Sequence, residues 1–272
     1  MTPTWRSDEP EPRPASPRGA QWLRVALKGT ALGVVIFGGL GLLLALRLLE
    51  RPLCGVRRPV TPYVTQAVCR AFFAILGMTH RTAGKPASKA GAVVANHSSW
   101  LDIFALNARQ NIYFVSKAEV AAWPGIGWLA RATGTVFISR RARDAAQQKS
   151  LFHARLQAGH KLLFFPEGTS SDGLRVLPFK STLFGAFFAD ELRDGLEIQP
   201  VTLCYTAPPG ADPRFYGWWG DMEFGEHLLA MLAAPRHGAV TVTYHAPVKV
   251  NAHGDRKQLA ARLEQAVRDG MG

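Results

Sequence analysis

Residues Asn96 to Asp102 read Asn-His-Ser-Ser-Trp-Leu-Asp and place a histidine and a carboxylate five positions apart. The apolar run Gly91–Ala95 comes directly before them. A neutral imidazole can take a proton from a weakly nucleophilic hydroxyl, and a carboxylate bonded to its other nitrogen fixes the tautomer and stabilises the imidazolium that forms. His97 and Asp102 are therefore a candidate general base and its orienting acid, although such a pair taken alone is common.

Three further segments place polar or charged residues at the ends of apolar runs. Residues 134–138 are followed by Arg140 and Arg141, and two guanidinium groups suit an anionic ligand. Residues 164–173 break at a proline into a polar loop with glycines, whose backbone amides could face a ligand. A strand-like run around Pro200 is the third segment. Each of them alone is compatible with an ordinary surface or turn.

The segments that must position these residues alternate between strand-like and helix-like patterns. The expected strands are residues 92–95, 112–115, 134–138, 162–165, 198–205 and 240–244. The expected helices are residues 99–108, 123–132, 144–158, 182–189 and 256–268. This alternation argues for an α/β layer structure with functional residues on loops at strand ends. We therefore predict a mixed central sheet flanked by helices.

The first 80 residues have a different character. Residues 1–19 hold five prolines among charged and small residues, which predicts a disordered tail. Residues 29–46 carry no charge, and as a helix they would reach about 27 Å, just short of the roughly 30 Å hydrocarbon thickness of a membrane. Residues 60–78 carry an apolar stripe at helical spacing, which predicts an amphipathic helix.

Basic residues flank the first of these two helices on both sides, so the positive-inside rule gives no clear orientation. A membrane-docking hairpin over residues 20–80 that dips into one leaflet explains this pattern better than a clean span. The alternative is a pair of core helices in a soluble domain, but five glycines between residues 29 and 41 weaken the first as an isolated soluble helix. Residues 81–272 are then the predicted catalytic domain.

The net charge limits the classes of partner that this chain is expected to bind. The chain has 272 residues with 32 Lys and Arg against 20 Asp and Glu, which gives a net charge of +12 and favours nucleic acid, an anionic membrane or an acidic carrier protein. Basic residues are spread along the chain without a nucleic-acid-binding motif, so we expect no nucleic acid partner. Three scattered cysteines predict neither a disulfide framework nor a zinc site, which fits a reducing cytosolic face.

Taken together and in this order, the segments resemble the glycerolipid acyltransferase family, which includes bacterial 1-acylglycerol-3-phosphate acyltransferases. His97 and Asp102 match the family's His-x4-Asp block, residues 134–140 its second block, residues 165–171 its Phe-Pro-Glu-Gly-Thr block and Pro200 its fourth. Residues 116–119 resemble the Lys-x-Glu stretch between the first two blocks. The resemblance covers roughly residues 73–251, and the paired N-terminal helices match the family's membrane-docking element.

The resemblance implies direct transfer of an acyl group from a thioester on coenzyme A or acyl carrier protein to a lipid hydroxyl, without an enzyme nucleophile and without a cofactor or metal. His97 would act as general base, a role that contributes roughly 10²–10⁴ in rate, with Asp102 orienting it. Backbone amides near Gly168 or Ser98 could bind the developing oxyanion. The residues expected at the lipid-acceptor site are Lys117, Arg140, Glu167, Gly168, Thr169, Ser170 and Arg175. We expect the catalytic domain on the cytoplasmic face of a bacterial inner membrane.

One departure from the family pattern concerns the acceptor. The third block usually continues Glu-Gly-Thr-Arg-Ser, with the arginine on the acceptor's phosphate, whereas this chain has Ser170 there. A charge-assisted hydrogen bond contributes about 1.5–3 kcal/mol, so its loss could cost ten- to a hundredfold in phosphate binding. Either Arg175, Lys117 or Lys180 supplies the charge for lysophosphatidate, or the natural acceptor lacks a phosphate, as lyso-ornithine lipid does. We favour the second explanation.

The sequence leaves two questions open: whether the protein is catalytic, and what its aromatic cluster does. A non-catalytic basic membrane-binding module would keep the same fold, but the intact His97 and Asp102 pair speaks against it. The aromatic cluster over residues 215–221 could line the acyl or acceptor channel or rest at the membrane interface, where Trp and Tyr are favoured. Its other interpretation is satellite core packing under a long loop.

Overall fold

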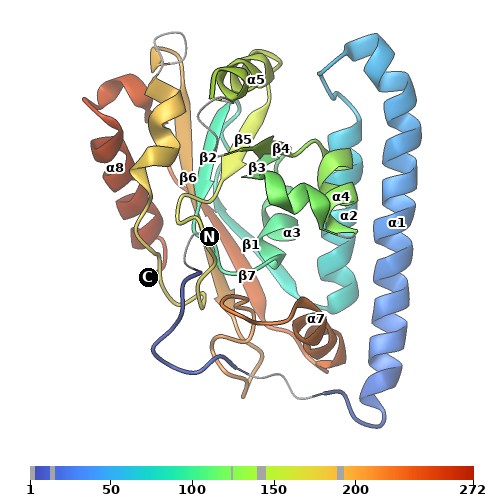
Figure 1. Cartoon of the computed structure of the whole chain (residues 1–272). Coiled ribbons are helices and arrows are strands. Elements are labelled where there is room, and N and C mark those ends of the chain that lie inside the picture. The colour runs from blue at the N-terminus through green and yellow to red at the C-terminus, as the bar shows by residue number, and fades with distance from the viewer. Residues whose placement is uncertain (1–3, 13–15, 124, 140–144, 189–192) are drawn as a thin grey trace.

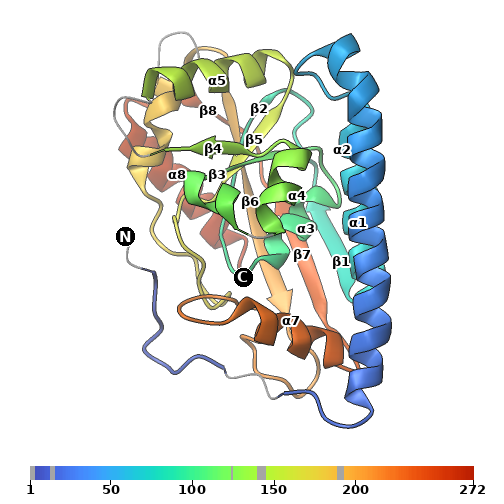
Figure 2. The same cartoon turned by 45° about the vertical axis from the view of Figure 1, so that its right-hand side comes forward.

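A mixed β-sheet forms the centre of the molecule, as Figures 1 and 2 show for a computed structural model that describes residues 4–12, 16–123, 125–139, 145–188 and 193–272. The described strands are β1 (Thr79–Gly84), β2 (Gly91–Ala95), β3 (Tyr113–Lys117), β4 (Val136–Ile138), β5 (Lys161–Phe164), β6 (Glu197–Thr206), β7 (Ala239–Tyr244) and β8 (Val248–Lys249). Their order is β1-β7-β6-β2-β5-β3-β4, and β8 pairs with β6.

The register of the central strands determines where the loops meet. β2 lies between β5 and β6 and is parallel to both, whereas β6 runs antiparallel to β7. The carboxyl ends of β2, β5 and β6 therefore reach the same edge of the sheet, which is where α/β sheets place ligands. The polar segments that follow β2 and β5 are brought together at this edge.

Helices cover both faces of the sheet (Figure 1). The described helices after residue 80 are α3 (Leu101–Asn107), α4 (Ile126–Thr133), α5 (Ala145–Gln157), α7 (Phe224–Ala233) and α8 (Arg256–Asp269), with 3-10 turns η1 (Ala118–Ala122), η3 (Ser181–Phe188) and η4 (Val250–Ala252). Ala92 and Val94 of β2 face the core shared with η3 and α8, while Val93 and Ala95 face the core shared with α3 and α7. β2 is buried on both faces, which explains its unbroken apolar sequence.

An N-terminal helical hairpin lies along one flank of the domain (Figures 1 and 2). It consists of α1 (Gln21–Cys54) and α2 (Thr61–Leu76). Buried Glu50 closes its turn, because the carboxylate accepts hydrogen bonds from the Val60 amide at 2.8 Å and from the Thr61 hydroxyl at 2.6 Å. A carboxylate in this position satisfies free N–H groups at the start of α2 and favours the helix dipole.

The two helices of the hairpin have different surroundings. α2 belongs to the catalytic core: the Phe72 ring stacks on Phe104 of α3 with centroids 4.1 Å apart and meets Trp100 edge-on. α1 is long and apolar enough to cross a membrane, and much of its apolar surface is uncovered. Its exposed large apolar side chains are Trp22, Leu23, Leu27, Val34, Phe37, Leu42, Leu44, Leu48, Leu49 and Leu53. A surface of this size and composition indicates membrane association.

The predicted α/β architecture is confirmed, with a few corrections. Each of the six expected strands is present, with ends shifted by up to two residues. β1, β8 and α7 were not predicted, and the segment expected as a helix over 182–189 forms a 3-10 turn over its described part. The helix expected from residue 123 begins at Ile126, because Gly125 adopts a φ of 70°. The boundary predicted at residue 80 falls within β1.

The tail predicted to be disordered over residues 1–19 has neither helix nor strand in its described residues, but residues 4–12 do not extend freely into solvent. Arg6 pairs with Asp221 at 2.7 Å, and Glu9 pairs with Arg214 at 3.1 Å. Trp5 lies beside Trp219, with ring centroids 6.2 Å apart. These ionic and aromatic contacts hold the tail against the loop that carries the aromatic cluster.

Candidate active site

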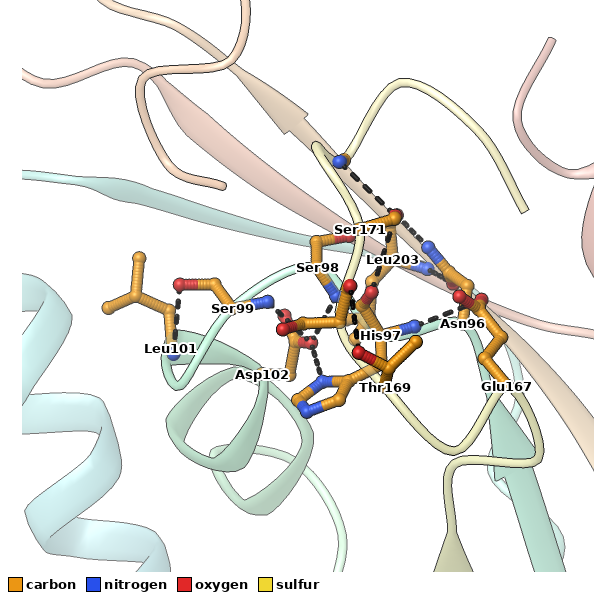
Figure 3. A network of polar contacts seen from close by, with 12 residues as sticks. Asn96, His97, Ser98, Ser99, Leu101, Asp102, Glu167, Thr169, Ser171 and Leu203 are labelled. Atoms are coloured by element: carbon orange, nitrogen blue, oxygen red, sulfur yellow. Dashed lines mark hydrogen bonds and ion pairs between the residues drawn. The ribbon is translucent and has the colours of Figure 1, made fainter. Parts of the chain in front are cut away.

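The loop between β2 and α3 begins at a side chain that extends the sheet. Asn96 is fully buried, and its amide Nδ2 donates to the Leu203 carbonyl at 2.9 Å. Its Oδ1 accepts from the Leu203 amide at 2.8 Å. This reciprocal pair ties the end of β2 to β6, so the next residue, His97, leaves the sheet from a fixed point (Figure 3).

His97 and Asp102 form the contact that their spacing predicts. The distance between His97 Nδ1 and Asp102 Oδ2 is 2.7 Å, and Figure 3 shows the imidazole pointing at the carboxylate. The Asp102 side chain is 0% exposed, while that of His97 is 22% exposed. With Nδ1–H donating to the carboxylate, Nε2 is the basic nitrogen of the ring. The pair can therefore accept a proton from a group that reaches the exposed edge of His97.

Asp102 is held by more donors than His97 alone. Oδ2 also accepts from the Ser98 amide at 2.8 Å and the Ser99 amide at 3.1 Å. Oδ1 accepts from the Tyr205 hydroxyl at 2.7 Å. Asp102 lies in the first turn of α3, and both of its carboxylate oxygens accept hydrogen bonds from the protein. The orientation of the Asp102 side chain is therefore fixed.

Tyr205 is a site residue that the sequence analysis missed. It comes from β6 and lies 103 residues from Asp102 in the chain. Burial and the neighbouring charge of Asp102 raise the pKa of Tyr205 well above its ordinary value, so the hydroxyl stays protonated and donates. The available signal was the alternation of side chains along a strand, which places Val201, Leu203 and Tyr205 on the same face of β6, in the core shared with α3.

Phe165 fixes the plane of the His97 imidazole. Its ring stacks on His97 with centroids 4.0 Å apart and an interplanar angle of 11°. Phe165 follows β5 directly, so the stack is supplied by the strand next to β2. Stacking on one face and the Asp102 bond at one edge together restrict the rotation of the His97 ring.

Glu167 supports the backbone of the histidine loop. Its side chain is 1% exposed, and Oε1 accepts a hydrogen bond from the His97 amide at 3.2 Å. Burial raises the pKa of this carboxyl to about 9, so it is neutral near pH 7. The family resemblance places Glu167 at the acceptor site, which stays a prediction, and the structure adds a contact of its side chain with the main chain of His97.

The loop after Glu167 turns sharply at Gly168, which has a φ of 73°. The Gly168 amide donates to the Phe165 carbonyl at 3.1 Å, and the Ser98 amide donates to Asp102. The amides of Gly168 and Ser98 themselves therefore already have acceptors within the protein, and an oxyanion role for other amides near these two residues stays a prediction. Thr169 and Ser170 follow on the surface of the loop and are partly exposed.

Three basic side chains surround this loop. Lys117 Nζ lies 3.3 Å from the Gly168 carbonyl, and a Cβ placed on Gly168 would lie 2.7 Å from Lys180 Nζ. Arg175 Nη2 pairs with Asp172 Oδ2 at 2.9 Å, and its side chain remains 52% exposed. The structure thus brings Lys117, Lys180 and Arg175 to one loop, whereas Arg140 lies outside the described residues.

The aromatic cluster packs mainly as core. Tyr216 and Trp219 are buried, and the Tyr216 hydroxyl accepts from the Gly238 amide at 2.9 Å. The cluster also reaches the site, because the Trp218 amide donates to the Ser98 carbonyl at 2.8 Å. The core interpretation is therefore confirmed for Tyr216 and Trp219, and the same loop is hydrogen-bonded to the residue that follows His97.

Comparisons with known proteins identify the family to which this chain is similar. A family profile described as acyltransferase matches residues 79–203, which include the His97 and Glu167 loops. A lyso-ornithine lipid O-acyltransferase of Rhodobacter capsulatus is 57% identical over 271 residues, covering 99% of this chain and 98% of that protein. A 1-acyl-sn-glycerol-3-phosphate acyltransferase of Neisseria gonorrhoeae is 43% identical over 114 residues, covering 42% of this chain and 43% of its own.

The fold also has a counterpart among solved structures. The crystal structure of PlsC, the 1-acyl-sn-glycerophosphate acyltransferase of Thermotoga maritima, superposes with a TM-score of 0.63 at 22% identity and covers 92% of this chain and 94% of its own. At this identity the likeness concerns the fold alone. Together with the full-length relative, these matches show that the chain belongs to the acyltransferase family and is an enzyme that transfers acyl groups.

Proposed function

We propose that this protein transfers a fatty acyl group from an acyl thioester to the hydroxyl of lyso-ornithine lipid, giving ornithine lipid. The contact between His97 Nδ1 and Asp102 Oδ2 at 2.7 Å carries the chemical part of this proposal. The acceptor is supported by Ser170, which stands where phosphate-binding relatives usually carry an arginine, and by the name of the relative that is 57% identical over nearly the whole chain.

The reaction is a single exchange of C–S for C–O. His97 Nε2 takes the proton of the acceptor hydroxyl while the oxygen attacks the thioester carbonyl. The tetrahedral oxyanion collapses, the C–S bond breaks, and the imidazolium returns its proton to the leaving thiolate. Asp102 stabilises the imidazolium through Nδ1 and keeps Nε2 directed outward. No covalent enzyme intermediate is required.

The charges around the Gly168 loop suit the headgroup of this acceptor. An ornithine that is acylated on its α-nitrogen keeps a carboxylate and a side-chain ammonium. Lys117, Lys180 and Arg175 supply cations for the carboxylate, and the half-exposed guanidinium of Arg175 can offer a planar fork to it. Thr169 and Ser170, which are partly exposed, can complete the site with hydroxyl groups. Arg140 is assigned to the same site by the family resemblance.

A second candidate acceptor is 1-acylglycerol-3-phosphate. The same three cations could hold a phosphate, and the Neisseria gonorrhoeae relative is named for this acceptor. The absence of an arginine at Ser170 favours the amino-acid lipid, because a neutral hydroxyl contributes less to phosphate binding than a guanidinium. The two acceptors differ in the charge and geometry of one headgroup, so a direct assay separates them.

We also propose that the enzyme docks along the flank formed by α1, on the cytoplasmic face of a bacterial inner membrane. Lys28 Nζ contacts the carbonyls of Leu76 and Ala234, and Arg24 Nη1 contacts the Ala233 carbonyl. These contacts fasten the first part of α1 sideways to α2 and α7, which favours insertion into one leaflet over a span. The net charge of +12 suits an anionic leaflet.

The donor is proposed to be acyl carrier protein or coenzyme A carrying the acyl group as a thioester. A basic protein attracts both, because acyl carrier protein is acidic and coenzyme A carries phosphates. Comparing the two donors at equal acyl-chain length, with the acceptor at saturation, gives the preference directly.

The function is tested with purified enzyme in mixed micelles, an acyl thioester donor, and lyso-ornithine lipid and lysophosphatidate side by side. We expect lyso-ornithine lipid to have the higher kcat/KM. His97→Ala should abolish turnover with either acceptor while retaining the fold. His253→Ala is the matched control. The hydrogen bonds described for His253 involve its backbone carbonyl and amide, and none of them involves its imidazole. Full activity of His97→Ala would overturn the mechanism, and a preference for lysophosphatidate would overturn the acceptor.

A further inference from the structure

The N-terminal segment over residues 4–12 passes the loop that carries the acceptor residues (Figures 1 and 2). Arg6 pairs with Asp221 at 2.7 Å, Glu9 with Arg214 at 3.1 Å, and the Asp221 amide donates to Glu11 Oε1 at 3.1 Å. Exposed ion pairs of this kind are individually weak, about 0–1 kcal/mol. Together they define the path of the segment and bring its single tryptophan to the site.

Trp5 touches three parts of the site wall. Its amide donates to Thr169 Oγ1 at 3.4 Å, within the loop that follows Glu167. Its ring lies tilted against Trp219, with centroids 6.2 Å apart. The guanidinium carbon of Arg175 lies 5.5 Å from the centroid of the Trp5 ring. Trp5 thus contacts the Thr169 loop through its amide, and its half-buried ring contacts the aromatic cluster and a cation of the acceptor site.

Arg175 is held on two sides. Along one edge, Nη2 pairs with Asp172 Oδ2 at 2.9 Å and Nε donates to Oδ1 at 3.3 Å. Asp172 is buried at 1% exposure, so it offers a fixed anchor for this edge. The Trp5 ring supplies a cation–π contact for the same guanidinium. A long side chain that is held by a carboxylate and an aromatic ring loses little further rotamer freedom when an anion binds to its outer edge.

We propose that Trp5 is a positioning residue of the acceptor site, which holds the Arg175 guanidinium ready for the anionic group of the lysolipid headgroup. This inference rests on the proposed acyl transfer to a lysolipid, but it holds for a carboxylate and for a phosphate alike. The N-terminal segment then contributes to acceptor binding through Arg175 and takes no part in the proton transfer at His97. Donor binding is independent of Trp5.

The test is steady-state kinetics of the full chain with the Trp5→Ala substitution. An exposed cation–π contact contributes about 0.5–1 kcal/mol, so we expect the KM for the lysolipid to rise about two- to fivefold. The kcat and the KM for the acyl thioester should stay at wild-type values. Trp5→Phe keeps an aromatic face and should restore most of the acceptor KM. Asp8→Ala is the control, because Asp8 is an exposed residue of the same segment.

A double-mutant cycle separates positioning from a general effect of the tail. Arg175→Ala should raise the acceptor KM by itself, and adding Trp5→Ala to it should change the KM no further, because the two residues act through one group. Additive effects would overturn the proposal. So would an unchanged acceptor KM in Trp5→Ala, or a lower one, which would mean that the segment obstructs the site. Running the series with each lysolipid keeps this result separate from the identity of the acceptor.

Discussion

Tyr205 binds Asp102 on the oxygen that His97 does not use. The Tyr205 hydroxyl lies 2.7 Å from Oδ1, while His97 Nδ1 lies 2.7 Å from Oδ2. The carboxylate is therefore held between a strand residue and the catalytic ring. Because Tyr205 comes from β6 and His97 from the end of β2, this arrangement joins two neighbouring strands through one buried charge.

Removing only the Tyr205 hydroxyl should weaken the orientation of Asp102. A hydrogen bond to a charged group contributes about 1.5–3 kcal/mol, and part of this will appear in the transition state when the imidazolium forms. We expect Tyr205→Phe to lower kcat about tenfold or more, with the KM for both substrates little changed. Stopped-flow or steady-state assays of thiol release measure the kcat and KM of this variant.

The matched control for that substitution is Tyr244→Phe. The Tyr244 hydroxyl is buried and has no hydrogen-bond partner among the described residues, so its removal should leave kcat unchanged and keep or raise the melting temperature. Equal losses of kcat in the two variants would show that the tyrosine bound to Asp102 has no special role.

Glu167 should make the fold less stable as the pH rises. In the unfolded chain a glutamate titrates near pH 4.3, whereas burial raises the pKa of folded Glu167 to about 9. Between these values the folded state binds one proton more than the unfolded state. The stabilising contribution is therefore fully present below about pH 4 and is lost as the pH rises through about 9.

Replacing this carboxyl with an amide removes the titration and keeps an acceptor for the His97 amide. We expect the fall in the free energy of unfolding between pH 6 and pH 9 to be smaller in Glu167→Gln than in the wild type. Glu226→Gln, at an exposed position on α7, serves as control. Identical pH profiles for the wild type and Glu167→Gln would contradict a neutral buried carboxyl.

The hairpin contains a glycine that a methyl group should disturb. A Cβ on Gly39 of α1 would meet Val68 Cγ2 of α2, whereas a Cβ on Gly41 meets nothing within 4 Å. Overpacking of a tight contact costs about 1–3 kcal/mol. Gly39→Ala should therefore lower the melting temperature in detergent, and Gly41→Ala should keep or raise it. Two variants with the same melting temperature would argue against close approach of the helices at Gly39.

Acceptor choice should respond to the residue at position 170. Ser170→Arg places a guanidinium on the partly exposed part of the loop, and a charge-assisted bond to phosphate contributes about 1.5–3 kcal/mol. We expect the kcat/KM for lysophosphatidate to rise about tenfold or more relative to that for lyso-ornithine lipid. Ser170→Ala should leave the ratio near its wild-type value. An unchanged ratio in the arginine variant would remove Ser170 from the explanation of acceptor choice.

Local patterns made part of the site predictable. His97 and Asp102 lie in one short segment, and their spacing alone is enough to bring a loop residue to the first turn of the next helix. Tyr205 could not be found in this way, because its contact depends on β6 lying beside β2. The role of Glu167 was missed for a similar reason, since sequence does not reveal that its side chain turns toward the main chain of His97.

In the fold, too, local sequence patterns were predictable and contacts between distant segments were not. β2 is apolar throughout and β5 is apolar after Lys161, because both faces of these strands are covered, and such runs are easy to recognise. β1 reads Thr-His-Arg-Thr-Ala-Gly, lies at the sheet edge and is mostly exposed, so no apolar pattern marks it. The contacts of Trp5 could not be predicted either, because a segment rich in proline and charge has no core of its own.

The packing of α2 has a consequence for how this enzyme can be handled. Phe72 of α2 is 1% exposed and packs against Trp100, the N-cap residue of α3, and against Phe104 of α3, the helix whose first turn carries Asp102. A truncation at residue 80 would thus delete one wall of the catalytic core together with the membrane-facing helix. We therefore expect trimming of the N-terminus for solubility to abolish activity, and detergent or nanodisc preparations of the whole protein are the appropriate material.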